Sequence, residues 1–430
     1  MGAVVSEGTA GVDLVKTMPN LCPFCLFDVL NSNQVTRFIM VYLYFFICLP
    51  VGLFLALNTL HYFFYALLGR TGRADDVTPT PTAVSVRKIA VLVPAYKEDT
   101  VILDSVRANL RQDYPKDQFD IIVIADQFQP HTLAALAELP VRVLPVSFAV
   151  STVTRALCAA LDSLPDNAYD LVVVADADNH LAPDFLSRVN AAFANGWWAI
   201  QGHRVAKNLD TRVALLDAVS EEINNHITRK GYRAAGLSAT IIGSGMAVDL
   251  GLMKAAMSGL TTIGGFDKEL AMKLAIGGHK IGYLEQAFVY DEKVAKRAIF
   301  EQQRTRWIAA QWQFVADYFR PGMGQLFRGQ WLSGLKLVQE MALPKVLLLG
   351  LLGLFFGISL LFGYAPVTFA LGGSLLLFVG SLLLSIPRYL WQKLSFRDLG
   401  VVFTLMFSFL KAAVNMRRAF KSFMHTPHNA

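Results

Sequence analysis

The chain has 430 residues, 54% of them hydrophobic and 17% charged, and its mean hydropathy is +0.42. This composition is too apolar for an ordinary soluble enzyme of that length and predicts a membrane protein. The formal net charge of +6 is spread over the whole chain, and we expect no nucleic-acid partner. Four cysteines in so long a chain do not indicate a disulfide framework.

Three apolar stretches, residues 38–68, 346–364 and 367–386, are each long enough to cross a hydrocarbon core of ~30 Å. The first is too long for a signal-peptide core, and no small-residue cleavage site follows it. We therefore expect a retained transmembrane anchor at residues 35–69. The other two stretches are predicted to form a pair of transmembrane helices at residues 346–387.

The distribution of basic residues predicts the orientation. They follow the first apolar stretch and the last one: Arg70, Arg73, Arg388, Lys393 and Arg397. The connector at residues 363–366 carries none, although Lys16 and Arg37 precede the first stretch. The positive-inside rule therefore predicts a cytosolic middle region, and we expect an integral protein of a bacterial inner membrane. Residues 399–410 are too short for a further span and favour an interfacial or re-entrant helix.

Strands and helices are predicted to alternate after a linker rich in Thr and Pro. They are a strand within residues 88–98, a helix at 101–111, a strand at 120–126, a helix at 131–139 and a strand at 171–174. This βαβ order is typical of a nucleotide-binding α/β domain with a largely parallel sheet. The sequence has neither a Gly-x-Gly-x-x-Gly loop after the first strand nor a Walker lysine loop, so it supports neither a dinucleotide site nor a P-loop.

An acidic pair, Asp176 and Asp178, follows the apolar run at residues 171–174. Open α/β folds place their ligands at the carboxyl ends of such strands, and the two side chains would point to the same side. This pattern indicates a site for a metal and a diphosphate. Taken alone, the pair is equally compatible with acids that cap a helix beginning near Pro183.

The motifs of the middle region resemble those of a known family, the membrane-embedded inverting glycosyltransferases of family 2. That group includes cellulose, chitin, hyaluronan and poly-N-acetylglucosamine synthases. The resemblance covers residues 87–345. It rests on motifs that occur in the family's order: the entry strand ending at residues 93–98, Asp126, Asp176-Ala177-Asp178, Gly243-Ser244-Gly245-Met246, Asp267-Lys268-Glu269-Leu270 and Gln303-Arg304-Thr305-Arg306-Trp307.

The resemblance implies a GT-A type α/β domain and assigns roles on the donor side of the site. Asp178 is expected to bind Mg²⁺ or Mn²⁺ directly, and Asp176 to contact the ribose or the water shell of the metal. Asp126 is expected to hold the nucleoside, with a helix cap as the alternative. Arg306 offers planar, permanently charged donors for the diphosphate. Arg155 could also touch the diphosphate, but a surface arginine is equally compatible with its position.

Inversion requires a base that takes the proton of the acceptor hydroxyl, and the resemblance points to Asp267. The family usually has Thr-Glu-Asp here, whereas this chain has Gly265-Phe266-Asp267, which leaves the geometry of the acceptor open. Glu269 is the second choice for the base. A helix N-cap is the structural alternative for Asp267.

Acceptor binding is expected to involve Trp307, whose flat ring can stack on a sugar, and Gln303, which could hydrogen-bond either substrate. Gly243 and Ser244 could let the acceptor approach the backbone closely, although a tight turn explains them as well. An alternative for the segment around Trp307 is an interfacial helix with a membrane-surface belt. That belt would consist of Trp307, Trp312 and Trp331 among Arg304, Arg320 and Arg328.

The sequence thus predicts seven segments: residues 1–34, N-terminal; 35–69, anchor; 70–86, linker; 87–320, cytosolic GT-A catalytic domain; 321–345, interfacial helix; 346–387, two transmembrane helices; 388–430, interfacial or re-entrant helix and basic tail. The expected activity is transfer of a sugar, by default from a UDP-sugar, to a growing polysaccharide. The alternatives are single transfer to a ceramide or polyprenyl lipid, and an inactive subunit of an export complex. Secretion of a polymer through so few spans would require an oligomer or an export partner.

Overall fold

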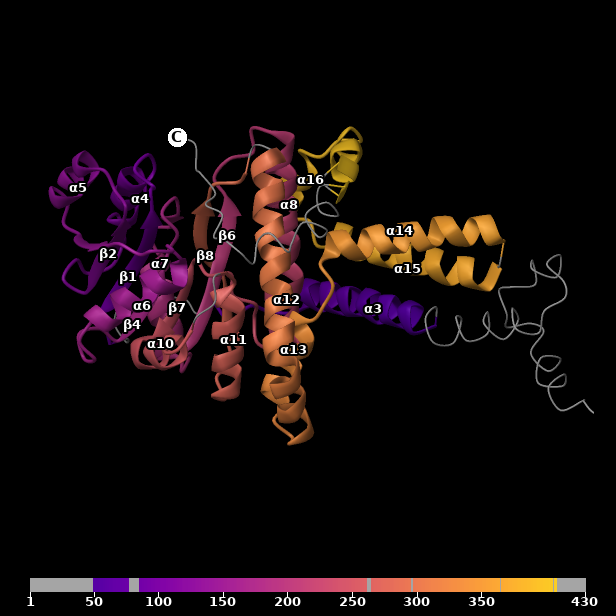
Figure 1. The fold of residues 1–430 in the computed structure, drawn as a ribbon, viewed down its shortest axis with the longest axis horizontal. Helices are drawn as coiled ribbons and strands as arrows, with labels where there is room; N and C mark the ends of the chain where they lie inside the picture. Colours follow the sequence, from indigo (N-terminus) through magenta and orange to yellow (C-terminus); the bar gives the residue numbers. More distant parts are fainter. Residues whose placement is uncertain are drawn as a thin grey trace, which may run out of the picture. The chain divides into compact units, whose positions relative to one another are not determined.

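The computed structural model describes residues 49–76, 85–260, 264–294, 297–363, 365–404 and 406–407 (Figure 1). The predicted N-terminal segment, the start of the predicted anchor and the basic tail from residue 408 lie outside the described residues. The chain divides into two packing units. One contains residues up to Phe63 together with 343–380, and the other contains residues 64–342 together with those from Ser381 onward.

The first unit consists of apolar helices. They are α3 (Leu49–Thr71), α14 (Lys345–Phe362) and α15 (Ala365–Leu384). The last two turns of α3 and the last turn of α15 belong to the second unit. The Tyr62 ring packs edge-on against Phe378 at 5.2 Å, and its hydroxyl donates to the Leu343 carbonyl at 2.8 Å. Among the described residues, α3 and α15 are long and apolar enough to cross a membrane; a third candidate arises if α13 (Trp331–Glu340) and α14 form one broken span.

The second unit is built on an eight-stranded sheet. Its strands are β1 (Ile89–Tyr96), β2 (Phe119–Asp126), β3 (Arg142–Val146), β4 (Leu171–Val174), β5 (His180–Leu181), β6 (Ala199–Ala206), β7 (Met246–Asp249) and β8 (Gly282–Asp291). The spatial order is β3-β2-β1-β4-β7-β6-β8-β5, and only β7 and β5 run antiparallel to their neighbours. The predicted α/β class with a mostly parallel sheet is confirmed. The carboxyl ends of β1, β2, β4, β6 and β8 consequently meet at one edge.

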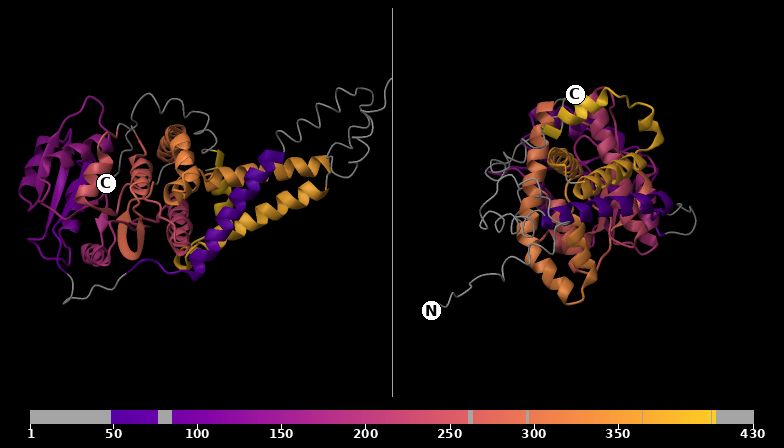
Figure 2. Two further views of the ribbon diagram at one scale, coloured as in Figure 1. Left: turned by 90° about the horizontal axis from the view of Figure 1, so that it is seen from below. Right: turned by 90° about the vertical axis from the view of Figure 1, so that its right-hand side faces the viewer.

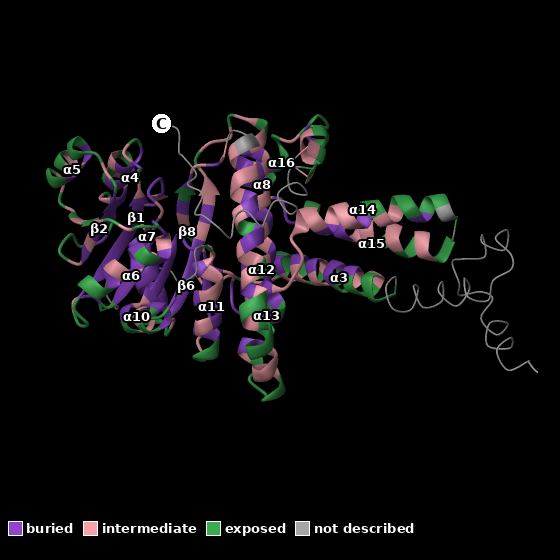
Figure 3. Cartoon of the chain, in the orientation of Figure 1, coloured by how far each residue is buried: buried purple, intermediate pink, exposed green. Residues whose placement is uncertain are grey.

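The central strands are buried on both faces, which explains their unbroken apolar runs. Leu92, Ile124 and Val174 join one core with α6 (Val153–Ser163) and α10 (Leu250–Met257). The alternating residues, such as Val93 and Val123, join the second core with α4 (Ile102–Asn109) and α7 (Phe185–Ala194). Figure 2 gives two further views of these layers, and Figure 3 shows the buried residues concentrated in the sheet.

Three helices form a smaller core beside the sheet. They are α11 (Phe266–Ile276), α12 (Arg297–Phe327) and α13, and they meet at Met272, Phe314 and Leu337. The structure differs here from the predicted segments, because the boundary expected at residue 320 falls inside the continuous helix α12.

The second difference concerns the predicted linker at residues 70–86. Its first part is fixed to β8, since Asp75 accepts from the Tyr283 amide and Asp76 accepts from the Glu285 amide, both at 2.9 Å. Residues 77–84 lie outside the described part of the chain.

The end of α3 packs closely on a π-helix, η3 (Asn225–Gly231), which continues α8 (Arg212–Asn224). A Cβ atom on Gly231 would lie 2.3 Å from the Tyr65 carbonyl oxygen, and one on Gly69 would lie 2.5 Å from the His226 carbonyl oxygen. Both glycines are therefore required by the close approach of the two helices.

We predict opposite effects for two Gly→Ala substitutions. Gly231→Ala should destabilise the protein by about 1–3 kcal/mol, because the new methyl group meets backbone. Gly324→Ala, in α12 with no atom within 4 Å of the added Cβ, should stabilise it by up to about 1 kcal/mol through helix propensity. Thermal unfolding of both variants in detergent measures the difference; equal unfolding temperatures would contradict the close packing.

Candidate active site

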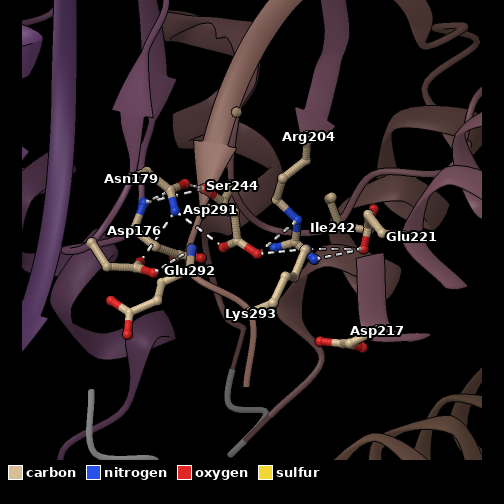
Figure 4. A network of polar contacts seen from close by, with 12 residues as sticks. Asp176, Asn179, Arg204, Asp217, Glu221, Ile242, Ser244, Asp291, Glu292 and Lys293 are labelled. Atoms are coloured by element: carbon tan, nitrogen blue, oxygen red, sulfur yellow. Dashed lines mark hydrogen bonds and ion pairs between the residues drawn. The ribbon is translucent and has the colours of Figure 1, made fainter. Parts of the chain in front are cut away.

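Three carboxylates gather at the carboxyl edge of the sheet. Asp176 and Asp178 follow β4, and Asp291 is the last residue of β8. One oxygen from each lies within 4.8 Å of the others. The predicted acidic pair is therefore part of a triad, and Figure 4 shows Asp176 and Asp291 within a network of polar contacts. The alternative that the pair caps a helix is wrong, because α7 begins at Phe185 and its N-cap residue is Asp184.

Hydrogen bonds from neighbouring loops hold the triad. The Asn179 amide group donates to Asp178 Oδ1 at 3.1 Å and to Asp291 Oδ1 at 3.2 Å. The Asp176 amide donates to Ser244 Oγ at 3.2 Å, and the Ser244 hydroxyl is bonded to Asn179 Oδ1. Ser244, a predicted acceptor-side residue, thus lies directly beside the acidic pair.

A buried ionic network compensates the negative charge of the triad. Asp291 lies 2.7 Å from Lys293 Nζ and 3.8 Å from Arg204 Nε. Arg204 in turn pairs with Glu221 at 3.1 Å, and Glu221 pairs with Arg229 at 3.0 Å. Burial alone would raise the pKa of Asp291, but Arg204 and Lys293 outweigh it and hold that pKa below its usual value. Asp291 is therefore ionised at neutral pH.

The donor set fits a hard divalent cation. Three carboxyl groups with oxygens within 4.8 Å of one another offer the oxygen ligands that Mg²⁺ and Mn²⁺ prefer. The residues that would hold such an ion are Asp176, Asp178 and Asp291. Asp291 is not among the residues predicted from the sequence, although an acid at the end of an apolar strand is the same signal that indicates Asp126.

Asp126 lies at the same edge, at the end of β2, two strands away from β4. Its side chain is 3% exposed, and Oδ1 has no hydrogen-bond partner in the described part of the chain. It does not cap a helix, since α5 (Pro130–Ala137) has Gln129 as its N-cap residue. A buried carboxylate oxygen without a donor is costly in a finished core, so Asp126 is suited to receive a hydrogen bond from a ligand.

Asp267 lies in the first turn of α11 and is not its N-cap residue, which is Gly265. Burial raises the pKa of its carboxyl, Lys268 lowers it, and the carboxylate of Glu340 raises it again, so that the pKa lies above its usual value. Such a shift makes a carboxylate a better proton acceptor.

The loop Gly243-Ser244-Gly245 joins the two halves of the site. A Cβ atom on Gly243 would lie 3.1 Å from the Phe266 ring and 3.8 Å from the Asp267 Cβ. The next residue, Ser244, contacts the Asp176 amide. The structure therefore brings the predicted base and the acidic triad next to consecutive residues of one tight loop, whose two glycines have φ of +77° and +62°.

Helix α12 contributes the third side of the site. Burial lowers the pKa of the Arg306 guanidinium, and the charge of Asp176 opposes that effect. Gln303 Oε1 is buried without a hydrogen-bond partner among the described residues. Trp307 remains 43% exposed. The predicted donor-side arginine is therefore within electrostatic reach of Asp176.

The structure corrects the alternative in which Arg304 belongs to a membrane-surface belt. Arg304 is 5% exposed and forms an ion pair with Asp217 of α8. Its guanidinium stacks 4.0 Å from the centre of the Trp307 ring and 4.4 Å from that of Phe300. Asp217 and Arg304 thus fix one side of Trp307, which no pattern in the sequence indicated because Asp217 lies 87 residues earlier.

Two secondary candidates lie outside this arrangement. Glu269, the second choice for the base, accepts a hydrogen bond from the Tyr318 hydroxyl at 2.8 Å. Arg155 is exposed and donates to the Val150 carbonyl at 2.7 Å, as expected for a surface arginine.

Comparison with known proteins defines the class. A family profile described as "Glycosyltransferase like family 2" matches residues 87–310, which is more than half of the chain. The chain therefore belongs to glycosyltransferase family 2.

Curated relatives carry related names. The chain is 23% identical over 256 residues to a "Probable glycosyltransferase YdaM" of Bacillus subtilis, covering 54% of this chain and 58% of the relative. It is 25% identical over 255 residues to a "Beta-monoglucosyldiacylglycerol synthase" of Synechocystis, covering 57% of this chain and 52% of the relative. The match thus spans only a little over half the length of these relatives.

Similar solved structures include mannosyltransferase PcManGT from Pyrobaculum calidifontis in complex with GDP-Man and Mn²⁺. That likeness has a TM-score of 0.49 at 20% identity, and covers 76% of this chain and 94% of the other. Another is TarS residues 1–349 from S. aureus in complex with UDP-GlcNAc, with a TM-score of 0.35 at 13% identity and coverages of 78% and 91%.

We predict that Asp217→Asn weakens sugar transfer by raising the acceptor KM about tenfold, because Arg304 would no longer hold Trp307. A matched control exists in Asp75→Asn, since Asp75 pairs at 2.6 Å with Arg233, which stacks on Trp197 at 4.8 Å away from the site. Steady-state kinetics with varied acceptor would measure the effect. Equal losses in the two variants would mean that both pairs serve only stability.

Proposed function

We propose that the protein transfers a sugar, with inversion, from a nucleotide diphosphate to an acceptor at a membrane surface. The observation that carries this proposal is the loop Gly243-Ser244-Gly245, which joins the acidic triad to Asp267. In-line transfer needs the leaving group and the base on opposite sides of the anomeric carbon, and this loop separates two groups of the right chemistry. Asp126 and Arg306 complete the donor side as ligands of the nucleoside and the diphosphate.

A divalent cation held by Asp176, Asp178 and Asp291 would neutralise the charge that develops on the leaving diphosphate. The side chains have distinct tasks around it. The guanidinium of Arg306 contributes permanent positive charge next to Asp176. Asp126 Oδ1, which has no hydrogen-bond partner among the described residues, accepts a hydrogen bond from a hydroxyl or amide group of the nucleoside. The default nucleoside is the uridine of a UDP-sugar.

The acceptor hydroxyl loses its proton to Asp267 as it attacks. The raised pKa of this carboxyl means that it is protonated, and inactive as a base, at higher pH than an ordinary aspartate. The rate should therefore be fully present above the raised pKa and fall as the pH drops through it. Trp307 and Gln303 lie on the same helix as Arg306 and would hold the acceptor sugar next to the base.

Two substitutions separate the donor side from the acceptor side. Asp178→Ala should abolish both hydrolysis of the nucleotide-sugar and transfer of its sugar, because it removes a ligand of the cation. Asp267→Asn should retain nucleotide binding but lose at least ~10²-fold in transfer, as expected for removal of a general base. The assay is a panel of nucleotide-sugars with and without Mn²⁺, at several pH values. Wild-type rates in both variants would refute the roles given to Asp178 and Asp267. Transfer that does not depend on a metal would refute the role given to the cation.

The acceptor has two candidates. The sequence predicts a growing polysaccharide, which would need an oligomer or partner for export. A lipid acceptor needs no channel, and two observations support it: the described residues offer two or at most three spans, and one relative is named for glucosyldiacylglycerol synthesis. We therefore put a lipid acceptor first. In the same assay, a single glycolipid product supports it, and a ladder of polymer supports the polysaccharide.

Helix α13 is proposed to take part in membrane attachment. In contrast to a helix on the surface of a soluble protein, it exposes apolar residues and buries charged ones. Its exposed residues are Trp331, Leu335 and Val338, while Lys336 and Glu340 are buried. A helix with apolar residues outside and charges inside suits contact with lipid. Together with α3 and α15 as spans, this supports an integral enzyme with a cytosolic catalytic unit, in a bacterial inner membrane by the distribution of basic residues.

We predict that a dye at position 338 senses lipid. NBD attached to Val338→Cys, with the native cysteines replaced by serine, should shift its emission to shorter wavelength in nanodiscs that contain the protein. Val150→Cys carries the same dye at a similarly exposed valine, 44% against 48%, and should not shift. Identical emission at both positions would exclude α13 from the membrane surface.

A further inference from the structure

Glu340, the last residue of α13, contacts all three helices of the smaller core. Its carboxylate lies 2.6 Å from Lys268 Nζ of α11 and 2.9 Å from Lys336 Nζ of its own helix. Its backbone carbonyl accepts a hydrogen bond from the Gln311 side chain of α12. Each helix is therefore tied to one buried residue by a polar contact.

This arrangement is buried and strongly charged. Lys336 and Glu340 are almost fully excluded from solvent. Burial alone would raise the pKa of Glu340, but Lys268 and Lys336 outweigh it and lower that pKa to about 2. The carboxylate is thus ionised at any physiological pH. Removing its charge would leave the fully buried Lys336 and the partly exposed Lys268 without their common carboxylate, which is unfavourable above all for Lys336.

The ion pair between Glu340 and Lys268 lies at the start of α11, and Lys268 directly follows Asp267. The neighbouring Gly265 is pressed against α12, since a Cβ atom there would lie 2.8 Å from Ala310 Cβ. One helical turn before Ala310, α12 carries Arg306 and Trp307. A shift of α11 would therefore change the distance between the proposed base and the groups proposed to bind diphosphate and acceptor.

We infer that Glu340 is a positioning residue for Asp267: through its ion pair with Lys268 it fixes the proposed base relative to α12. The inference rests on the proposed function, in which Asp267 takes the acceptor proton. Because Glu340 ends the helix whose outer face carries Trp331, Leu335 and Val338, it also connects the proposed lipid-contacting helix to the base.

The charges of Lys268 and Glu340 shift the pKa of Asp267 in opposite directions, and this can be tested. The charged groups that act on Asp267 are Lys268 on its own helix, which lowers the pKa, and Glu340 on α13, which raises it. The acid limb is the part of the pH profile in which the transfer rate falls as the pH drops. Glu340→Gln removes a negative charge near Asp267 and should move this limb to lower pH. Lys268→Met should move it to higher pH. A purely structural role for the pair would not shift the limb in opposite directions.

The experiment compares Glu340→Gln, Lys268→Met and the control Asp75→Asn in the full-length protein in nanodiscs. We expect a transfer rate roughly ten- to a hundredfold lower in Glu340→Gln, with unchanged affinity for the nucleotide, and an unaltered pH profile in the control. Hydrogen exchange of the amides at residues 266–270 provides a readout without activity. It should accelerate in both test variants and not in Asp75→Asn.

The outcomes separate the two proposals. An acid limb and exchange rates identical to wild type in Glu340→Gln would overturn the positioning role. Should Glu340→Gln fail to fold, Lys268→Met still decides, because it breaks the same ion pair and must accelerate amide exchange at residues 266–270; unchanged exchange there would overturn the positioning role. If the wild-type protein transferred no sugar from any nucleotide, the proposed function would fail, whereas faster exchange in the two test variants would still support the tie between Glu340 and α11.

Discussion

The repulsion among Asp176, Asp178 and Asp291 is the constraint on which this site depends. Three carboxylates within 4.8 Å would push one another apart or take up protons unless positive charge stood behind them. Arg204 and Lys293 supply it for Asp291, and Glu221 keeps these cations in place with help from Arg229. A buried network of ion pairs therefore lies beside the end of β8, next to the triad.

The same principle recurs on the acceptor side with the signs exchanged. Arg304 and Lys268 flank the proposed acceptor region, and each is held by a buried acid, Asp217 or Glu340, from another helix. Such pairs add little stability compared with apolar packing, but they define distances. Precise distances are what a transfer reaction needs, because the attacking oxygen, the anomeric carbon and the base must lie nearly in line.

Much of the site was accessible from the sequence because local patterns encode it. Apolar runs that end in an acid marked Asp126 and the pair Asp176 and Asp178, and the strand at residues 171–174 was placed to the residue. The partners of the buried charges were not accessible. Asp291, Asp217 and Glu340 reach their partners only through the packing of distant strands and helices, so no spacing in the sequence reveals them. Arg304 was misplaced for the same reason, since an arginine beside tryptophans has the composition of a surface belt whether or not a carboxylate lies behind it.

The end of α3 has a practical consequence. Its last two turns pack on η3 through Gly69 and Gly231, and the following Asp75 and Asp76 bind the amides of β8. The second unit thus begins at residue 64, inside a helix that hydropathy alone assigns to the bilayer. A soluble fragment cut at the apparent linker would lose part of its own core and expose Tyr283 and η3 to water. A fragment meant to contain the whole second unit should therefore begin within α3. Its exposed apolar helix surface would have to be kept in solution, for example by fusion to a solubilising partner.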